Sequence, residues 1–145
     1  MEALENCITS LYHQAFTVSD DYLRHVDAME AKSTGWETRS NLQLSCTRKG
    51  NHLDLKWTGL KWYGPKGARH SIRLAITKSK ETLGYSEDKL KPYAKSWEIE
   101  KVLSTEAQLQ MIRRKATHTV KAIISLRHAI RLAKKKSVEL ADSDE

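Results

Sequence analysis

The first 32 residues carry apolar side chains at alternating steps of three and four, the spacing of a helix packed lengthwise against another helix. The stripe consists of Leu4, Ile8, Leu11, Ala15, Val18, Tyr22, His25 and Met29, and a weaker one of Tyr12, Phe16, Leu23 and Val26. Two stripes indicate a helix that is covered on more than one side. No Pro or Gly precedes Gly35, so we expect one long helix; the alternative is a break at Ser19-Asp20-Asp21, which offers an N-cap.

Between residues 42 and 76 the period changes to two, which is typical of half-buried strands. The apolar positions are Leu42, Leu44 and Cys46, then Leu53, Leu55 and Trp57, and then Ile72, Leu74 and Ile76. Residues 49–51 predict a tight reversal and residues 64–67 a longer one, because both contain glycine. We therefore expect a three-stranded antiparallel meander with one apolar face. The opposite face would present Gln43, Ser45, Thr47, His52, Asp54, Lys56, Ser71 and Arg73.

Helical spacing returns after Lys80. Ser86-Glu87-Asp88 is a helix start signal, Pro92 predicts a further helix through Val102, and Ser104-Thr105-Glu106 predicts the cap of the last helix. That helix repeats the first seam at Leu109, Ile112, Ala116, Thr119, Ile123, Leu126, Ile130 and Ala133. Two long helices with matching seams are most simply partners, within one chain or across a homodimer. The expected fold is a single α+β domain of residues 1–145, with residues 137–145 as an acidic tail that need not be ordered.

Positive charge is concentrated in two segments. The chain has 145 residues and a net charge of +7 at pH 7. Residues 33–80 hold ten Lys or Arg against two acids, and residues 109–136 hold nine and no acid, whereas residues 1–32 are net acidic. Basic segments of this kind favour polyanionic partners such as nucleic acids.

The remaining composition predicts a cytoplasmic protein without a membrane partner. No apolar run approaches the roughly 20 residues that cross a bilayer, and the acidic start differs from the positive start of a signal peptide. Cys7 and Cys46 have no metal-ligand spacing, so we expect buried free thiols.

The stretch KWYGPKGARHSIRL, residues 61–74, combines aromatic and basic side chains at the tip of the expected second hairpin. Its candidate DNA-binding residues are Lys61, Trp62, Tyr63, Lys66, Arg69, His70 and Arg73. The cations suit backbone phosphates, and the two large aromatics suit insertion into a groove or stacking on a base. The alternative for Trp62 and Tyr63 is that they cover the edge of the apolar sheet face.

The last helix supplies a second set of candidate phosphate contacts. These are Arg113, Arg114, Lys121, Arg127 and Arg131. A row of cations on one helix face neutralises several phosphates and releases their counterions, which gives affinity without base specificity. The alternative is a solvated face whose charges pair with the acidic first helix.

Two other classes of function remain open. Asp54-Leu55-Lys56 after Glu37 is reminiscent of nucleases that place two carboxylates on Mg²⁺, with a lysine beside them. A protein-interaction module would instead use the long amphipathic helices to bind a partner. The chain has no glycine-rich phosphate loop, paired metal histidines or nucleophile motif. We therefore expect a non-catalytic protein with no metal and no cofactor.

Four segments carry a family likeness that spans most of the chain. They are WETRSNLQL, HLDLKWTGLKWYGPKG, SWEIEKVL and MIRRKATHTVKAIISLRHAIRLAKKK. Their order resembles that of the MobI proteins of conjugative plasmids and integrative conjugative elements. The resemblance implies a cytoplasmic accessory factor that binds DNA at the origin of transfer and helps a relaxase to start strand transfer. It carries over no catalytic residue, and it implies the relaxase or other transfer proteins as partners.

Overall fold

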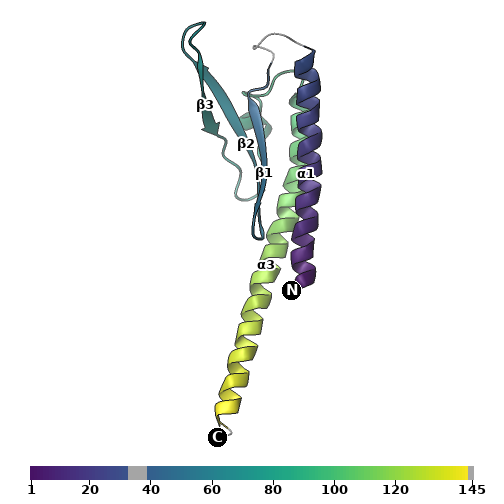
Figure 1. Ribbon diagram of the computed structural model, residues 1–145, viewed down its shortest axis with the longest axis vertical. Coiled ribbons are helices and arrows are strands. Elements are labelled where there is room, and N and C mark those ends of the chain that lie inside the picture. Colours follow the sequence, from purple (N-terminus) through teal and green to yellow (C-terminus); the bar gives the residue numbers. More distant parts are fainter. Residues whose placement is uncertain (33–38, 144–145) are drawn as a thin grey trace.

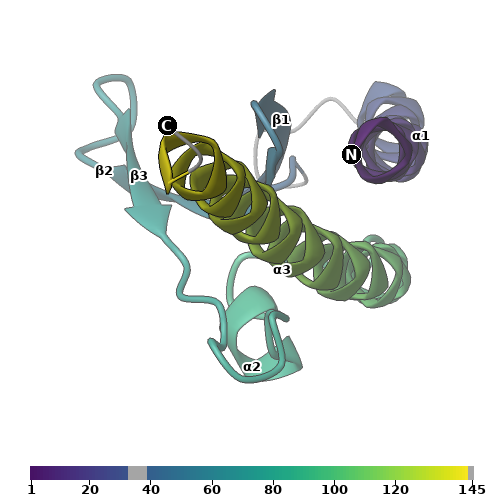
Figure 2. The same ribbon diagram turned by 90° about the horizontal axis from the view of Figure 1, so that it is seen from below.

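The computed structural model describes residues 1–32 and 39–143, and it confirms an α+β fold (Figure 1). In chain order the elements are α1 (Glu2–Ala31), β1 (Leu42–Lys49), β2 (His52–Tyr63), β3 (His70–Ala75), α2 (Glu87–Leu90) and α3 (Ile99–Ser143). Helices α1 and α3 lie side by side and run in opposite directions, and the sheet packs beside them (Figures 1 and 2). α3 continues well past the start of α1 and includes residues 137–143, which the sequence predicted as a separate tail.

The seam predicted for the first helix is the face that packs against α3 and the sheet. Ile8, Leu11, Ala15 and Tyr22 on this face are buried. The helix is continuous through residues 19–21, where Ser19 is buried, Asp20 pairs with Arg24 one turn later and Asp21 accepts a hydrogen bond from Lys101 of α3.

The predicted second covered side of α1 is wrong at two positions. Phe16 is 55% exposed and Leu23 is 43% exposed, whereas Tyr12 and Val26 pack against the edge of the core. The sheet therefore covers only the margin of this second stripe.

The sheet is an antiparallel meander in the order β1-β2-β3, as predicted. β1 and β2 are joined by a two-residue turn in which Gly50 adopts a φ of 60°. Leu53, Leu55 and Trp57 face the helices and are buried. The half-burial predicted for the third strand is wrong at Ile72, which is 45% exposed. β3 pairs only with residues 58–63 of β2, the part of that strand that leads away from the helices.

A buried carboxylate, Glu98, fixes the start of α3. It accepts hydrogen bonds from the Tyr22 hydroxyl at 3.0 Å, the Ser40 hydroxyl at 2.7 Å and the backbone N–H of Lys95 at 2.9 Å. Burial and the nearby Glu98 carboxylate raise the pKa of Tyr22 far above its usual value. The phenol therefore stays protonated and remains a donor to Glu98.

The helix predicted from Pro92 is absent, since residues 91–98 form turns and α3 begins at Ile99. The ring of Tyr93 packs so closely on β2 that a Cβ at Gly59 would lie 2.6 Å from it. The cap predicted at residues 104–106 is also wrong, because Thr105 and Glu106 lie inside α3 and are buried. The Glu106 carboxylate makes tertiary contacts where the sequence pattern indicated a helix start.

Glu106 and Arg113 form a buried ion pair that joins α3 to the sheet. Arg113 Nη1 lies 2.9 Å from Glu106 Oε2, and the guanidinium also donates to the carbonyl oxygens of Leu55 and Leu83. Glu106 in turn accepts from the Trp57 indole N–H at 3.0 Å and the Tyr85 backbone N–H at 2.9 Å. The pair thus ties one helix to β2 and to the segment that precedes α2.

Both cysteines are free, as predicted, but the predicted burial is wrong. Cys7 is exposed and Cys46 is half-buried. Burial raises the pKa of the Cys46 thiol. Within residues 1–32 and 39–143 the structure has no helix that combines the length and apolar character of a membrane span.

We expect the Tyr22→Phe variant to lose about 1.5–3 kcal/mol of unfolding free energy, the range for a hydrogen bond to a charged group. The change leaves the ring in its edge-on contact with Trp57, at 5.0 Å between centroids, and removes only the donor to Glu98. Urea denaturation followed by circular dichroism measures the loss. Tyr63→Phe in the exposed hairpin is the control, with an expected change within about 0.5 kcal/mol. An equal effect of the two variants would contradict a special role for the Tyr22 hydroxyl.

Candidate nucleic-acid interface

The basic arm, defined as residues 61–73, is the hairpin formed by the end of β2, a glycine-containing loop and the start of β3. Every residue in it is exposed. Gly64 and Gly67 have φ values of 97° and 98°, and the Ala68 backbone N–H donates to the carbonyl of Pro65 at 3.0 Å. A Cβ at Gly64 would lie 2.7 Å from the Ala68 carbonyl oxygen, so the reversal requires glycine there. The loop carries its cations at the end of a projecting two-stranded ribbon (Figure 1).

Because side chains alternate along a strand, the arm presents two different faces. Trp62, Ser71 and Arg73 belong to the outer face of the sheet, the face turned away from α1 and α3. The opposite face of the arm carries Lys61, Tyr63, His70 and Ile72. Nearer to the start of β2, the same face of the sheet carries the buried core residues. The two aromatics predicted as a pair therefore point to opposite sides.

Trp62 is both anchored and accessible. Its indole N–H donates to the side-chain oxygen of Asn41 at 3.2 Å, and 44% of the residue remains exposed. The backbone N–H of Leu60 donates to the carbonyl of the same Asn41 at 2.7 Å. Asn41 thus holds the indole against β1 while part of the ring stays open to solvent.

Tyr63 is held on the other face by its neighbours in the arm. Its ring stacks on His70 with centroids 6.0 Å apart, and Lys61 Nζ lies 5.3 Å from the centre of the ring. Tyr63 is 39% exposed. The cluster of Lys61, Tyr63 and His70 is therefore ordered by contacts within the arm.

Arg113 does not belong to the exposed basic face that the sequence predicted. The residue is only 5% exposed and its guanidinium is committed to Glu106, Leu55 and Leu83. In the sequence Arg113 only follows Ile112, an apolar residue of the predicted seam. The fold shows that its ion-pair partner is Glu106, seven residues earlier in the chain. We therefore remove Arg113 from the candidate DNA contacts.

The other four helix candidates are exposed, and two of them have protein partners. Arg114 donates to the carbonyl of Thr82 at 3.2 Å, and Arg127 pairs with Glu5 of α1 at 3.3 Å. Lys121 and Arg131 are exposed, as are residues 134–136, which are all lysine. The alternative in which the basic face pairs with the acidic first helix therefore applies at Arg127.

The arm and the basic end of α3 lie at opposite ends of the longest axis of the molecule (Figure 1). Viewed along that axis, both lie on the same side of α1 (Figure 2). The fold therefore separates the two candidate regions along the longest axis of the molecule and leaves both on the same side of α1.

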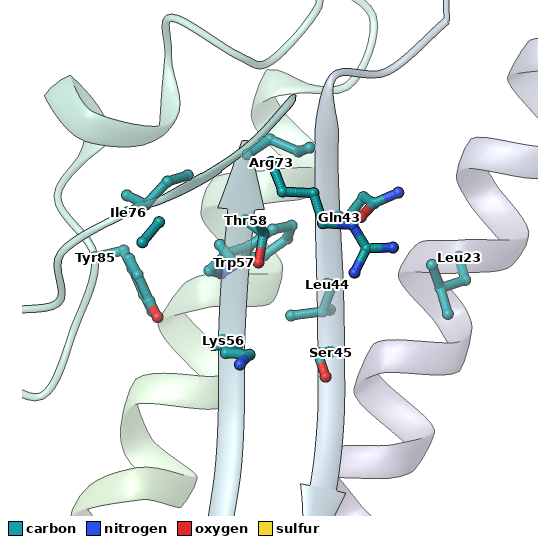
Figure 3. A pocket seen from close by; sticks show the side chains of 12 residues that line it. Leu23, Gln43, Leu44, Ser45, Lys56, Trp57, Thr58, Arg73, Ile76 and Tyr85 are labelled. Carbon is teal, nitrogen blue, oxygen red and sulfur yellow. The ribbon is translucent and has the colours of Figure 1, made fainter. Parts of the chain in front are cut away.

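Two adjoining open grooves lie on the outer face of the sheet and reach past the edge of β1 to α1, where Leu23 lines the larger groove and Val26 and Glu30 line the smaller one. The larger has a volume of about 790 Å³ and includes Lys56 and Arg73, and the smaller, about 530 Å³, ends at Trp62. In the view of Figure 3 the Arg73 side chain extends across the sheet toward Gln43 of β1, and both residues line the larger groove. Sequence reasoning missed Asn41 in this region, because no local signal reveals that residue 41 contacts residue 62.

The nuclease hypothesis involves three residues, of which the structure describes Asp54 and Lys56. Asp54 Oδ2 and Lys56 Nζ are 3.8 Å apart on the outer face, with both side chains about half exposed. Glu37 lies outside the described residues. Within the described ranges there is no group of three or more His, Cys, Asp or Glu side chains placed to hold a metal ion.

Comparison with known proteins places the chain in one family. No curated protein and no solved structure matches it. The family model described as MobI protein matches residues 11–127, which include the sheet, the basic arm and α3 as far as Arg127. The match covers most of the chain and agrees with the resemblance carried by its sequence segments, and it gives the protein a context in mobilisation. The chain belongs to the MobI family.

Proposed function

We propose that this protein binds DNA at an origin of transfer as a non-catalytic accessory factor of conjugative transfer, together with a relaxase. The single observation that carries the proposal is the basic arm, which presents Lys61, Lys66, Arg69 and Arg73 on an exposed ribbon. No Asp or Glu occurs between Asp54 and Glu81. A two-stranded ribbon of this charge fits a DNA groove and its flanking phosphates.

The exposed cations of α3 support the same function. Residues 107–138 contain no acid, and Lys121, Arg131 and the lysines at 134–136 are exposed. α3 has 45 residues, so it is about 68 Å long, which corresponds to about 20 base pairs. A duplex lying along the side shared by the arm and the end of α3 would meet both regions.

This arrangement assigns separate roles to the two regions. The α3 cations would supply electrostatic affinity that does not depend on sequence. The arm, with aromatic and amide side chains near it, is the part equipped to contact bases. In this proposal the protein holds the DNA for the relaxase and does not itself catalyse a reaction.

The Lys66→Ala and Arg69→Ala variants should each lower the slope of log K against log salt by about 0.9, the value for one phosphate contact in duplex DNA. The measurement is fluorescence anisotropy with a labelled origin-of-transfer duplex at several salt concentrations, with and without Mg²⁺. The control is Lys49→Ala, which removes one exposed charge at the far end of the sheet. An unchanged slope in both arm variants would remove the arm from the DNA interface.

The same experiment separates the two other classes of function. A nuclease would cut the DNA only when Mg²⁺ is present, and Asp54→Ala would abolish the cutting without changing the circular dichroism spectrum. A protein-interaction module would bind no DNA at any salt concentration. This second candidate is favoured by one observation, the exposed apolar residues Ile130 and Leu132, which follow Arg127, the α3 residue that pairs with Glu5 near the start of α1.

A further inference from the structure

The two grooves on the outer face of the sheet form one continuous track. Leu42 and Gln43 line both of them, so the larger groove passes into the smaller one at β1. Each has the volume of a typical site for a small organic ligand. Along β2 the track runs from Lys56, past Arg73, which pairs with Leu60, to Trp62.

The larger groove is lined for an anionic ligand with hydrogen-bonding edges. Its lining includes the cations Lys56 and Arg73 and no carboxylate, whereas Asp54 lies 3.8 Å from Lys56 outside the lining and Glu30 lines the smaller groove. Gln43, Ser45 and Thr58 add neutral donors and acceptors on the same face (Figure 3). Cationic side chains bind phosphates, and neutral donors and acceptors form hydrogen bonds with base edges.

The smaller groove ends at a fixed aromatic surface. The indole N–H of Trp62 donates to the side-chain oxygen of Asn41 at 3.2 Å, which favours one orientation of the ring while the residue stays 44% exposed. A pre-positioned aromatic loses little conformational entropy when a flat ligand stacks on it. The face of a nucleobase is available for such stacking only when the base is unpaired or flipped out.

We propose that the outer face of the sheet binds a short stretch of unpaired DNA, with one base stacked on Trp62 and the adjoining backbone held near Arg73 and Lys56. This inference rests on the proposed function, and it specifies that the DNA bound at the outer face is unpaired. Gln43 lies midway along the track and is positioned to contact a base edge. The opposite face of the arm, with Tyr63 stacked on His70, remains outside this track.

The test compares two neighbouring aromatics that point to opposite faces. Trp62→Ala, Trp62→Phe and Tyr63→Ala are measured with a labelled 12-nucleotide single strand and with the blunt duplex of the same sequence. We expect Trp62→Ala to weaken single-strand binding about tenfold or more and duplex binding less than twofold, from the size of a base-aromatic stack. Trp62→Phe should retain most of the affinity, and Tyr63→Ala should change it less than threefold.

The other outcomes of these binding measurements would contradict either the single-strand track or the proposed DNA binding. Equal losses in Trp62→Ala and Tyr63→Ala, or no loss in either, would refute the track while leaving DNA binding by the arm intact. Wild-type protein that binds the duplex but not the single strand would do the same. Wild-type protein that binds neither DNA would overturn the proposed function itself. A circular dichroism melt of each variant shows whether a loss of binding comes from a loss of folding.

Discussion

Replacing Glu106 with leucine should lower the free energy of unfolding by about 3–5 kcal/mol, the cost of leaving one charge of a buried ion pair without its partner. Glu106 and Arg113 have side chains that are 5% and 4% exposed. Removing the carboxylate leaves the Arg113 guanidinium buried, and it also deprives the Trp57 indole N–H and the Tyr85 backbone N–H of their acceptor. Chemical denaturation followed by tryptophan fluorescence and circular dichroism measures the change.

The matched control is Glu100→Leu, an exposed glutamate in the first turn of the same helix. Its expected cost is at most about 1 kcal/mol, from the loss of a favourable charge near the helix N-terminus. The Glu106→Leu/Arg113→Met double variant should lose less than the sum of the two single variants, because it removes both charges. Additive losses would show that the pair is not energetically coupled, in contradiction of its geometry.

Removing charge from both basic regions at once should cause the largest loss of DNA binding. One triple variant changes Lys61, Lys66 and Arg73 of the arm to alanine, and a second changes Arg131, Lys134 and Lys135 of α3. On a 30-base-pair duplex each should lower the salt slope by about 2.7, and the combined variant by about 5.4. Salt titrations by fluorescence anisotropy provide the measurement.

Duplex length supplies the decisive control for this prediction. A duplex of about 10 base pairs is half the length that α3 spans, so it should not engage both regions at once. On this short duplex the combined variant should show a slope change close to that of a single triple variant. Losses that add equally on short and long duplexes would contradict binding along the long axis of the molecule.

Most of the fold could be predicted because its signals are local. The three-and-four spacing of the first seam and the two-residue period of the strands each depend on residues close in sequence, as do the turns at Gly50 and Gly64. The errors arose where a tertiary contact uses a residue that looks like a local signal. Glu106 resembles a helix cap, but its acceptor oxygens serve Trp57 and Arg113.

The candidate interface was predictable in composition and not in arrangement. Sequence reasoning identified the cations and aromatics of the arm, since they lie within 14 residues of one another. Alternation along a strand would have placed Trp62 and Tyr63 on opposite faces once both were assigned to β2. Their partners could not be predicted, because those depend on the register of β2 with β3 and on Asn41. Nor could sequence reasoning distinguish the buried Arg113 from the exposed Arg114, since the two differ only in which side of α3 meets the sheet.

The pairing of α1 with α3 sets the order in which the protein can fold during synthesis. Tyr22 meets Glu98 and Cys7 meets Thr119, so the apolar seam of the first helix finds its partner only about a hundred residues later. At about 5–20 residues per second, this interval lasts on the order of 5–20 s. The β1-β2 hairpin has only local contacts to form and can close early. The nascent chain therefore carries an uncovered amphipathic helix until α3 leaves the ribosome, and its core closes last.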